Sequence, residues 1–321
     1  MRKDRAMEED RGRRARKPRE IPKKGWRDIL VRVSQEQKKD NLSIVAAGVA
    51  FYALLAIFPA LAALISIYGL VADPAQLEQQ LQSLGQVLPP NAYEVIGQQL
   101  HAIVTSSGGA LGLGVIAGIL LSLWSAAKGM KAMITALNIT YEEKERRGFV
   151  KLNGVALLLT LGAIVFVLFS LGLIVVLPAL LDRLPLPELL QGVLSFARWP
   201  LLGLLVIAAL ALLYRYAPSR DQPQWKWVSW GAVAATGLWL VLSALFSFYV
   251  SNFGNYNETY GSVGAVVILL LWFFLTAYMV LLGAEMNAEM EHQTRHDTTR
   301  GEPRRMGERD ARMADTVARK P

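Results

Sequence analysis

Three charged residues stand where long uncharged stretches of the sequence end. Lys128, Arg215 and Glu285 follow uncharged runs of 18, 16 and 22 residues. If these runs cross a membrane in the same direction, the three charges reach the same boundary. Lys128, Lys131 and Arg215 could then bind a phosphate or lipid headgroup, and Glu285 with Glu289 could close an ion-paired gate on one helical face. Alternatively, these charges are helix-end anchors that extend toward water or pair with one another to fix the topology.

A second group of polar side chains lies between two later apolar runs. The segment 251–264 reads SNFGNYNETYGSVG and combines amide and phenol groups with glycines that allow tight turns. Such a loop could bind a polar headgroup or a sugar, or fold back as a re-entrant plug. It could equally be a well-built turn between two long helices. The binding hypothesis uses Asn252, Asn255, Tyr256, Asn257 and Tyr260.

The elements that would position these residues are unusually long apolar blocks. Residues 44–72, 152–181, 227–250 and 263–284 are uncharged for 29, 30, 24 and 22 residues. A hydrocarbon core about 30 Å thick needs about 20 apolar residues of helix, so these blocks predict membrane spans. The two shorter runs, 110–127 and 199–214, could instead be re-entrant or buried among the other helices.

The distribution of lysine and arginine decides between these alternatives. Of the 34 basic residues, 15 lie in 1–43, six in 128–151, three in 215–226 and eight in 286–321, against none in 73–109 or 251–262. With six spans, 32 of the 34 fall on one side of the membrane, and that side should be cytoplasmic. The sequence therefore predicts an all-α integral membrane protein with both termini in the cytoplasm. Its six transmembrane helices are expected at about 44–72, 110–127, 152–181, 199–216, 227–250 and 263–285.

The segments that flank this membrane domain (25–291) differ from it in composition. Residues 1–24 and 292–321 are rich in charge and poor in aromatic residues, so we expect a disordered basic arm and a disordered charged tail. Trp26, Ile29, Leu30 and Val33 recur at helical spacing and predict an amphipathic helix at the inner leaflet. Two further amphipathic helices are expected within 77–103, either resting on the outer face or covering the end of the bundle there.

The sequence lacks the residues that metal binding and proton-coupled transport need. The chain has no cysteine and only three histidines, of which His292 and His296 stand four apart without a third ligand, so we expect no metal and no other cofactor. The central halves of the six predicted spans contain no Asp, Glu, Lys, Arg or His. Because a proton relay needs an ionisable group in the membrane, this disfavours a proton-driven antiporter.

Five stretches of the chain carry a resemblance to a known family. They begin at Ala46 (AAGVAFYALLAIFPALAALISIYGL), Trp124 (WSAAKGMKAMITALNITYEEKERRGFVK), Arg215 (RYAPSRDQPQWKW), Tyr249 (YVSNFGNYNETYGSVGAVVILLLWFF) and Leu281 (LLGAEMNAE). In order and spacing they resemble the YihY/BrkB family of bacterial inner-membrane proteins, over roughly residues 26–291. The resemblance implies a six-span helical fold in the cytoplasmic membrane, with transport of a lipid or envelope precursor among the activities proposed for the family.

Members of that family were formerly labelled as the tRNA-processing ribonuclease BN. Metal-dependent nucleases need clustered His and Asp residues, which this sequence lacks, so we expect no nuclease and no other enzyme. Our main hypothesis is a translocator of an amphipathic, phosphate-bearing lipid or envelope precursor. The alternative is a scaffold that recruits envelope-assembly partners. In both hypotheses the protein could form a homo-oligomer. We expect the basic tails to bind anionic lipids of the bilayer rather than a specific nucleic acid.

Overall fold

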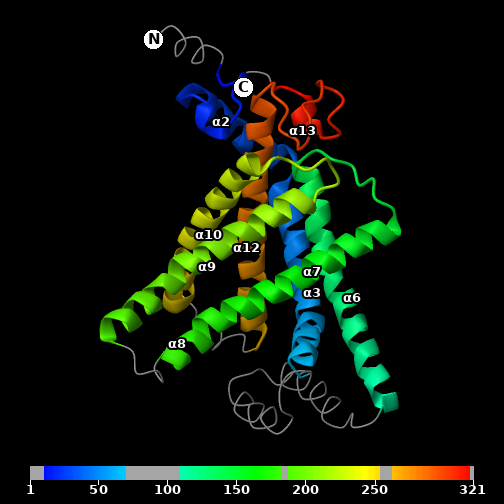
Figure 1. Cartoon of the computed structure of the whole chain (residues 1–321), viewed down its shortest axis with the longest axis vertical. Helices are drawn as coiled ribbons and strands as arrows, with labels where there is room; N and C mark the ends of the chain where they lie inside the picture. Colours follow the sequence, from blue (N-terminus) through cyan, green and yellow to red (C-terminus); the bar gives the residue numbers. More distant parts are fainter. Residues whose placement is uncertain (1–10, 70–108, 182–186, 254–261, 319–321) are drawn as a thin grey trace.

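The computed structural model describes residues 11–69, 109–181, 187–253 and 262–318 (Figure 1). Within these ranges the chain is helical and forms no strand beyond one isolated bridge between Pro223 and Thr299. The helices in chain order are η1 (Pro18–Glu20), α2 (Lys23–Lys39), α3 (Leu42–Gly69), α6 (Gly109–Thr140), α7 (Phe149–Leu171), the π-helical η2 (Gly172–Val176), α8 (Leu177–Leu181), α9 (Glu188–Tyr216), α10 (Trp225–Phe253), α12 (Ser262–Gln293) and α13 (Arg312–Asp315). The predicted all-α class is confirmed.

Four of the described helices are long and apolar enough to cross a membrane. They cover residues 149–174, 189–216, 225–251 and 266–293. The helices α2 and α3 provide a fifth candidate span if they are taken as one helix pair, bent by 63° at the break between them. The described part of the chain is therefore a bundle of four or five candidate spans.

The helix α9 begins earlier than the sequence pattern predicts. The predicted span covers about 199–216, whereas the helix starts at Glu188 and continues through Arg198 and Trp199. The guanidinium of Arg198 lies 5.4 Å from the centre of the Trp199 ring, an arrangement that lowers the cost of a cation on a helix surface. The helix α6 likewise continues past Lys128 and Lys131 to Thr140.

The helix α12 is the centre of the bundle. It packs against α10, α3, α2 and α6, while α7 packs against α6 and α9 against α10. Figure 1 shows α7 and α9 crossing the bundle obliquely. Where α10 and α12 meet, a Cβ added to Gly231 would lie 2.1 Å from the carbonyl oxygen of Gly283. Small residues thus bring these two backbones together, as is typical of helices packed in membranes.

Both flanking segments, predicted to be disordered, are folded wherever the structure describes them. Ala15 and Ile21 in the first segment, and Thr298 and Ala314 in the second, are buried. The two segments also bond to each other, because the amide of Arg295 donates to the carbonyl of Arg13 (2.9 Å). They lie together at one end of the bundle (Figure 1). We call the assembly of 11–39, 294–318 and the connections 141–148 and 217–224 the cap.

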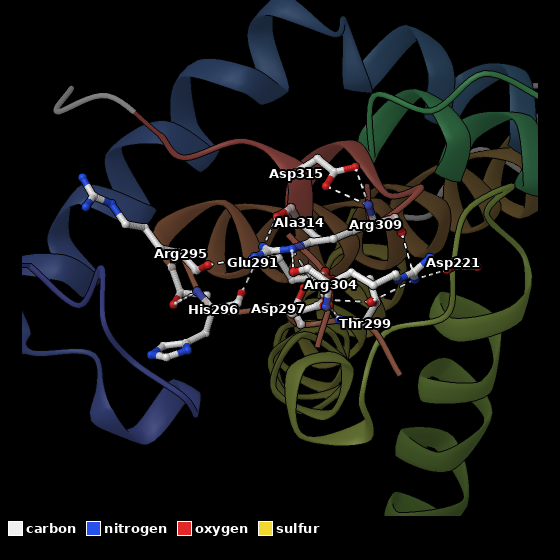
Figure 2. Close-up of polar contacts among 12 residues, drawn as sticks. Asp221, Glu291, Arg295, His296, Asp297, Thr299, Arg304, Arg309, Ala314 and Asp315 are labelled. Carbon is white, nitrogen blue, oxygen red and sulfur yellow. Dashed lines mark hydrogen bonds and ion pairs between the residues drawn. The ribbon is translucent and has the colours of Figure 1, made fainter. Parts of the chain in front are cut away.

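The tail, expected to be disordered, is folded over residues 294–318 because polar side chains, rather than a large apolar core, organise it. Arg309 is only 4% exposed, and its guanidinium donates to the carbonyl oxygens of Arg295, His296, Arg304 and Ala314 (Figure 2). The carboxylate of Asp315 accepts from the Arg309 amide. A buried guanidinium with several acceptors can fix a short segment that composition alone assigns to disorder.

Candidate functional site

A groove between α3 and α6 contains the two lysines that the sequence analysis assigns to a headgroup site. Its volume is about 530 Å³, and it lies along the first turns of α3 and the last turns of α6. Apart from Lys128 and Lys131, its lining is mainly aliphatic and aromatic. The other lining residues are Val45, Gly48, Val49, Tyr52, Ala132, Thr135, Ala136 and Ile139.

One side of this groove is formed where Gly129 of α6 packs against α3. A Cβ added to Gly129, which lies between the two lysines, would stand 3.1 Å from the Cβ of Ala56 and 3.3 Å from the carbonyl oxygen of Tyr52. Glycine therefore lets α6 approach α3 closely at this level. As a result, Lys128 and Lys131 lie next to the contact between α3 and α6.

The two lysines have different surroundings. The ammonium of Lys131 lies 5.0 Å from the centre of the Trp124 ring, and Trp124 in turn contacts Phe149, with ring centres 6.3 Å apart. Lys128 is exposed. Among the described residues no carboxylate lies within ion-pair distance of either ammonium group. The groove thus combines apolar walls with two cations that can accept an anionic partner.

Arg215 does not belong to this groove. It lies in the last turn of α9, only 7% exposed, and its Nη1 donates to the carbonyl oxygen of Pro223 at 2.6 Å. Its guanidinium also lies 4.4 Å from the centre of the Trp225 ring. Arg215 therefore fixes the connection between α9 and α10, which corresponds to the anchoring alternative of the sequence analysis.

The two glutamates of the predicted gate also separate. Glu289 forms an ion pair with Arg32 of α2, whose Nη2 donates to Gln293 at 2.6 Å. Glu285, one turn earlier on α12, is completely buried, and neither of its carboxylate oxygens has a hydrogen-bond partner among the described residues. The ion pair thus joins α12 to α2, and not to the cations of the groove.

A further buried ion pair connects α12 to the cap. The guanidinium of Arg220 donates to both carboxylate oxygens of Glu291 at 2.8 Å, with both side chains fully buried. The hydroxyl of Thr298 donates to Glu291 at 2.7 Å, and the Arg220 guanidinium lies 4.6 Å from the centre of the Tyr141 ring. The surroundings of Glu291 and the neighbouring Asp221–Arg304 pair can be followed in Figure 2.

Three paired residues were not predicted from the sequence: Arg32, Arg220 and Glu291. Arg32 stands between Ile29 and Val33 on the buried face of α2. A charge placed between two aliphatic residues at helical spacing was a signal that could have identified it as paired in the interior. Arg220 and Glu291 are 71 positions apart, and no local pattern relates them.

At the capped end of the bundle, the surroundings of two carboxyl groups shift their pKa values. Hydrogen bonds from the Arg147 side chain and amide, with one from Asn138, lower the pKa of Glu145 to about 2. Burial, together with the nearby Glu36 carboxylate, raises the pKa of Asp40 to about 6. Asp40 lies at the break between α2 and α3, so this carboxyl group gains a proton more readily than an exposed one.

The polar loop between α10 and α12 remains a prediction. Asn252 lies in the last turn of α10, and Asn255, Tyr256, Asn257 and Tyr260 lie outside the described residues. The two amphipathic helices expected within 77–103 are also outside them.

Comparison with known proteins identifies the family to which this helical bundle belongs. The family model described as virulence factor BrkB matches residues 33–308, which include α3, α12 and most of the cap. The chain belongs to the virulence factor BrkB family. The resemblance noted from the sequence is thereby confirmed, although the match extends into the folded tail.

Relatives in this family carry membrane-protein or ribonuclease-like names. A Bacillus subtilis protein named as ribonuclease-like, YfkH, is 33% identical over 249 residues, covering 76% of this chain and 88% of YfkH. UPF0761 membrane proteins of Idiomarina loihiensis and Photobacterium profundum are 27% and 26% identical, covering 80% and 85% of this chain and 88% and 84% of their own lengths. No solved structure matches. The apolar helices and these relatives identify a multi-pass protein of the bacterial cytoplasmic membrane.

Proposed function

We propose that this chain crosses the membrane six times, with the cap in the cytoplasm, and translocates an amphipathic, phosphate-bearing lipid or envelope precursor. Two observations support the topology. The helix α6 has 32 residues and packs beside α3, so it is long enough to add a span to the candidates already described. The cap also contains most of the basic residues, and such residues accumulate on the cytoplasmic side.

The groove between α3 and α6 is the observation that carries the proposed transport. A lipid with a phosphate headgroup needs an apolar surface for its chains and a cation for its phosphate. The groove offers both, because its aliphatic walls adjoin Lys128 and Lys131, which have no carboxylate partner among the described residues. An ammonium group binds phosphate as a point charge without requiring a fixed planar geometry.

The other predicted residues take different roles in this proposal. Arg215 supports the α9–α10 connection, and Glu289 with Arg32 holds α12 to α2 at the capped end. The loop with Asn252, Asn255, Tyr256, Asn257 and Tyr260 would meet the headgroup on the opposite side of the membrane. The proposal includes no catalytic step. In the described part of the chain, no group of three or more His, Cys, Asp or Glu side chains could hold a metal ion.

The test uses the full chain reconstituted in vesicles that contain a fluorescent phospholipid in both leaflets. Chemical reduction of the outer-leaflet dye reports movement of lipid between leaflets. We expect the unaltered protein to accelerate this movement, and Lys128→Ala with Lys131→Ala to slow it at least tenfold, since two phosphate contacts are lost. The matched control is Lys226→Ala, at the start of α10 and outside the groove.

Two outcomes would contradict the proposal. Equal rates for the double variant and the Lys226→Ala control would remove the groove as the headgroup site. No acceleration by the unaltered protein, with phospholipids and lipid-linked sugar phosphates alike, would favour the scaffold alternative, in which the chain recruits envelope-assembly partners without moving lipid.

A further inference from the structure

The outward face of α2 combines exposed apolar side chains with basic ones. Leu30 and Val31 are 57% and 38% exposed, and they line a hollow of about 710 Å³. Lys23 and Arg27 line the same hollow, two turns and one turn before them respectively, so the four side chains form a stripe on one side of the helix. Trp26, Ser34 and Gln35 complete its lining.

The opposite face of α2 explains why these residues stay on the outside. Ile29 and Val33 are buried toward the bundle, and Asp28 on that side is bound by the guanidinium of Arg11, at 2.7 and 2.6 Å. The other acid of the helix, Glu36, pairs with Lys39. In the described ranges, neither Lys23 nor Arg27 has a carboxylate partner, so the outward stripe carries net positive charge.

The position of α2 places this stripe near the membrane boundary. The ring of Trp26 contacts that of Trp230, with ring centres 5.9 Å apart. Trp230 stands in the second turn of α10, within a candidate span that begins at Trp225. The helix is also bent 63° from α3, so it turns away from the direction of the spans. Tryptophans at this level are typical of the interface between headgroups and hydrocarbon.

We propose that the outward stripe of α2 docks onto the anionic phospholipid surface of the leaflet at the capped end. Leu30 and Val31 enter the boundary between headgroups and acyl chains, while Lys23 and Arg27 bind lipid phosphates. Charge complementarity selects this occupant, because a stripe of aliphatic groups beside unpaired cations matches an anionic lipid surface. The docking does not depend on whether the protein transports lipid.

The test uses the absence of cysteine in the chain, which allows a single label to be placed by substitution. Leu30→Cys and, separately, Ser34→Cys receive a nitroxide spin label in the full chain, reconstituted in vesicles of phosphatidylcholine and phosphatidylglycerol. We expect both labels to collide several-fold more often with oxygen, which concentrates in lipid, than with a water-soluble nickel complex. The control is Met306→Cys in the cap, 42% exposed, for which the nickel complex should dominate.

A second measurement tests the contribution of charge. A fluorophore at Ser34→Cys is quenched by spin-labelled phosphatidylglycerol or phosphatidylcholine. Each basic residue near the surface should contribute about a fivefold preference for the anionic lipid. Lys23→Ala with Arg27→Ala should therefore abolish most of the preference, whereas Lys144→Ala, exposed in the loop after α6, should leave it unchanged.

Three results would overturn the inference. A label at position 30 or 34 that is as accessible to the nickel complex as one at 306 would place the stripe in water. A label shielded from both reagents would show that a protein surface, such as a second copy of the chain, covers it. Equal quenching by the two lipids would contradict the proposed binding of lipid phosphates by Lys23 and Arg27.

Discussion

The α3–α6 groove lies at the same end of the bundle as the cap, but the cations of the two regions have different surroundings. In the cap the buried guanidiniums of Arg32, Arg220 and Arg309 each face a carboxylate. In the groove Lys128 and Lys131 face none among the described residues. Because a buried charge is costly without a partner, the cap cations must be structural, while the groove cations remain available for a ligand. The presence or absence of a carboxylate partner separates the two roles.

The largest expected effect comes from breaking the buried pair of the cap. Arg220→Ala leaves the Glu291 carboxylate buried and without its main partner, which should destabilise the protein by roughly 3–5 kcal/mol. Thermal unfolding in detergent, followed by circular dichroism, measures this loss. Arg220→Met with Glu291→Leu removes both charges and should recover most of the stability. If Arg220→Ala unfolds at the temperature of the unaltered protein, the comparison between cap and groove fails.

The next effect tests how the groove is built. Gly129→Val should cost about 1–3 kcal/mol, because even the Cβ would contact Ala56 and Tyr52 at 3.1 and 3.3 Å. Gly118→Val on the same helix is the matched control, since a Cβ there meets nothing within 4 Å. The difference in unfolding temperature between the two variants isolates the α3–α6 contact. Equal temperatures would show that α6 does not depend on this close approach.

A smaller effect is expected from pH at the edge of the cap. The pKa of Glu145 is lowered to about 2 from an ordinary value of 4.5, so the pairing with Arg147 stabilises the fold fully above pH 4.5. This stabilisation is lost as the pH falls from 4.5 toward 2. Because Glu145 is exposed, the effect should be about 0–1 kcal/mol. Hydrogen exchange at 145–147 should rise over that window, and Glu145→Gln should remove the dependence.

The smallest effect on stability should come from the groove itself. Lys128→Ala breaks no ion pair among the described residues, so it should change the free energy of unfolding by no more than about 0.5 kcal/mol. The same unfolding assay that detects Arg220→Ala checks this. A loss above 2 kcal/mol for this variant would show that Lys128 is structural after all.

The helices were largely predictable, but their ends and partners were not. An uncharged run such as 152–181 predicts a helix from composition alone, because a span must satisfy its backbone internally. The helix α9 starts at Glu188, before the predicted span of 199–216, and the ring of Trp199 lies beside Arg198 within the helix. Of the candidate site, Lys128 and Lys131 were predictable as neighbours on one helix, whereas the separation of Arg215 from them was not.

The sequence by itself determined that this chain is a helical membrane protein, and it predicts that the cations gather at one end. These properties depend on the length and charge of continuous segments, so the linear sequence is sufficient to predict them. Only the tertiary structure decided which cations are paired. The contacts of Glu289 with Arg32 and of Arg220 with Glu291 join residues 257 and 71 positions apart. Their partners follow from how the helices pack, since a charge pairs with what the fold brings within a few ångströms.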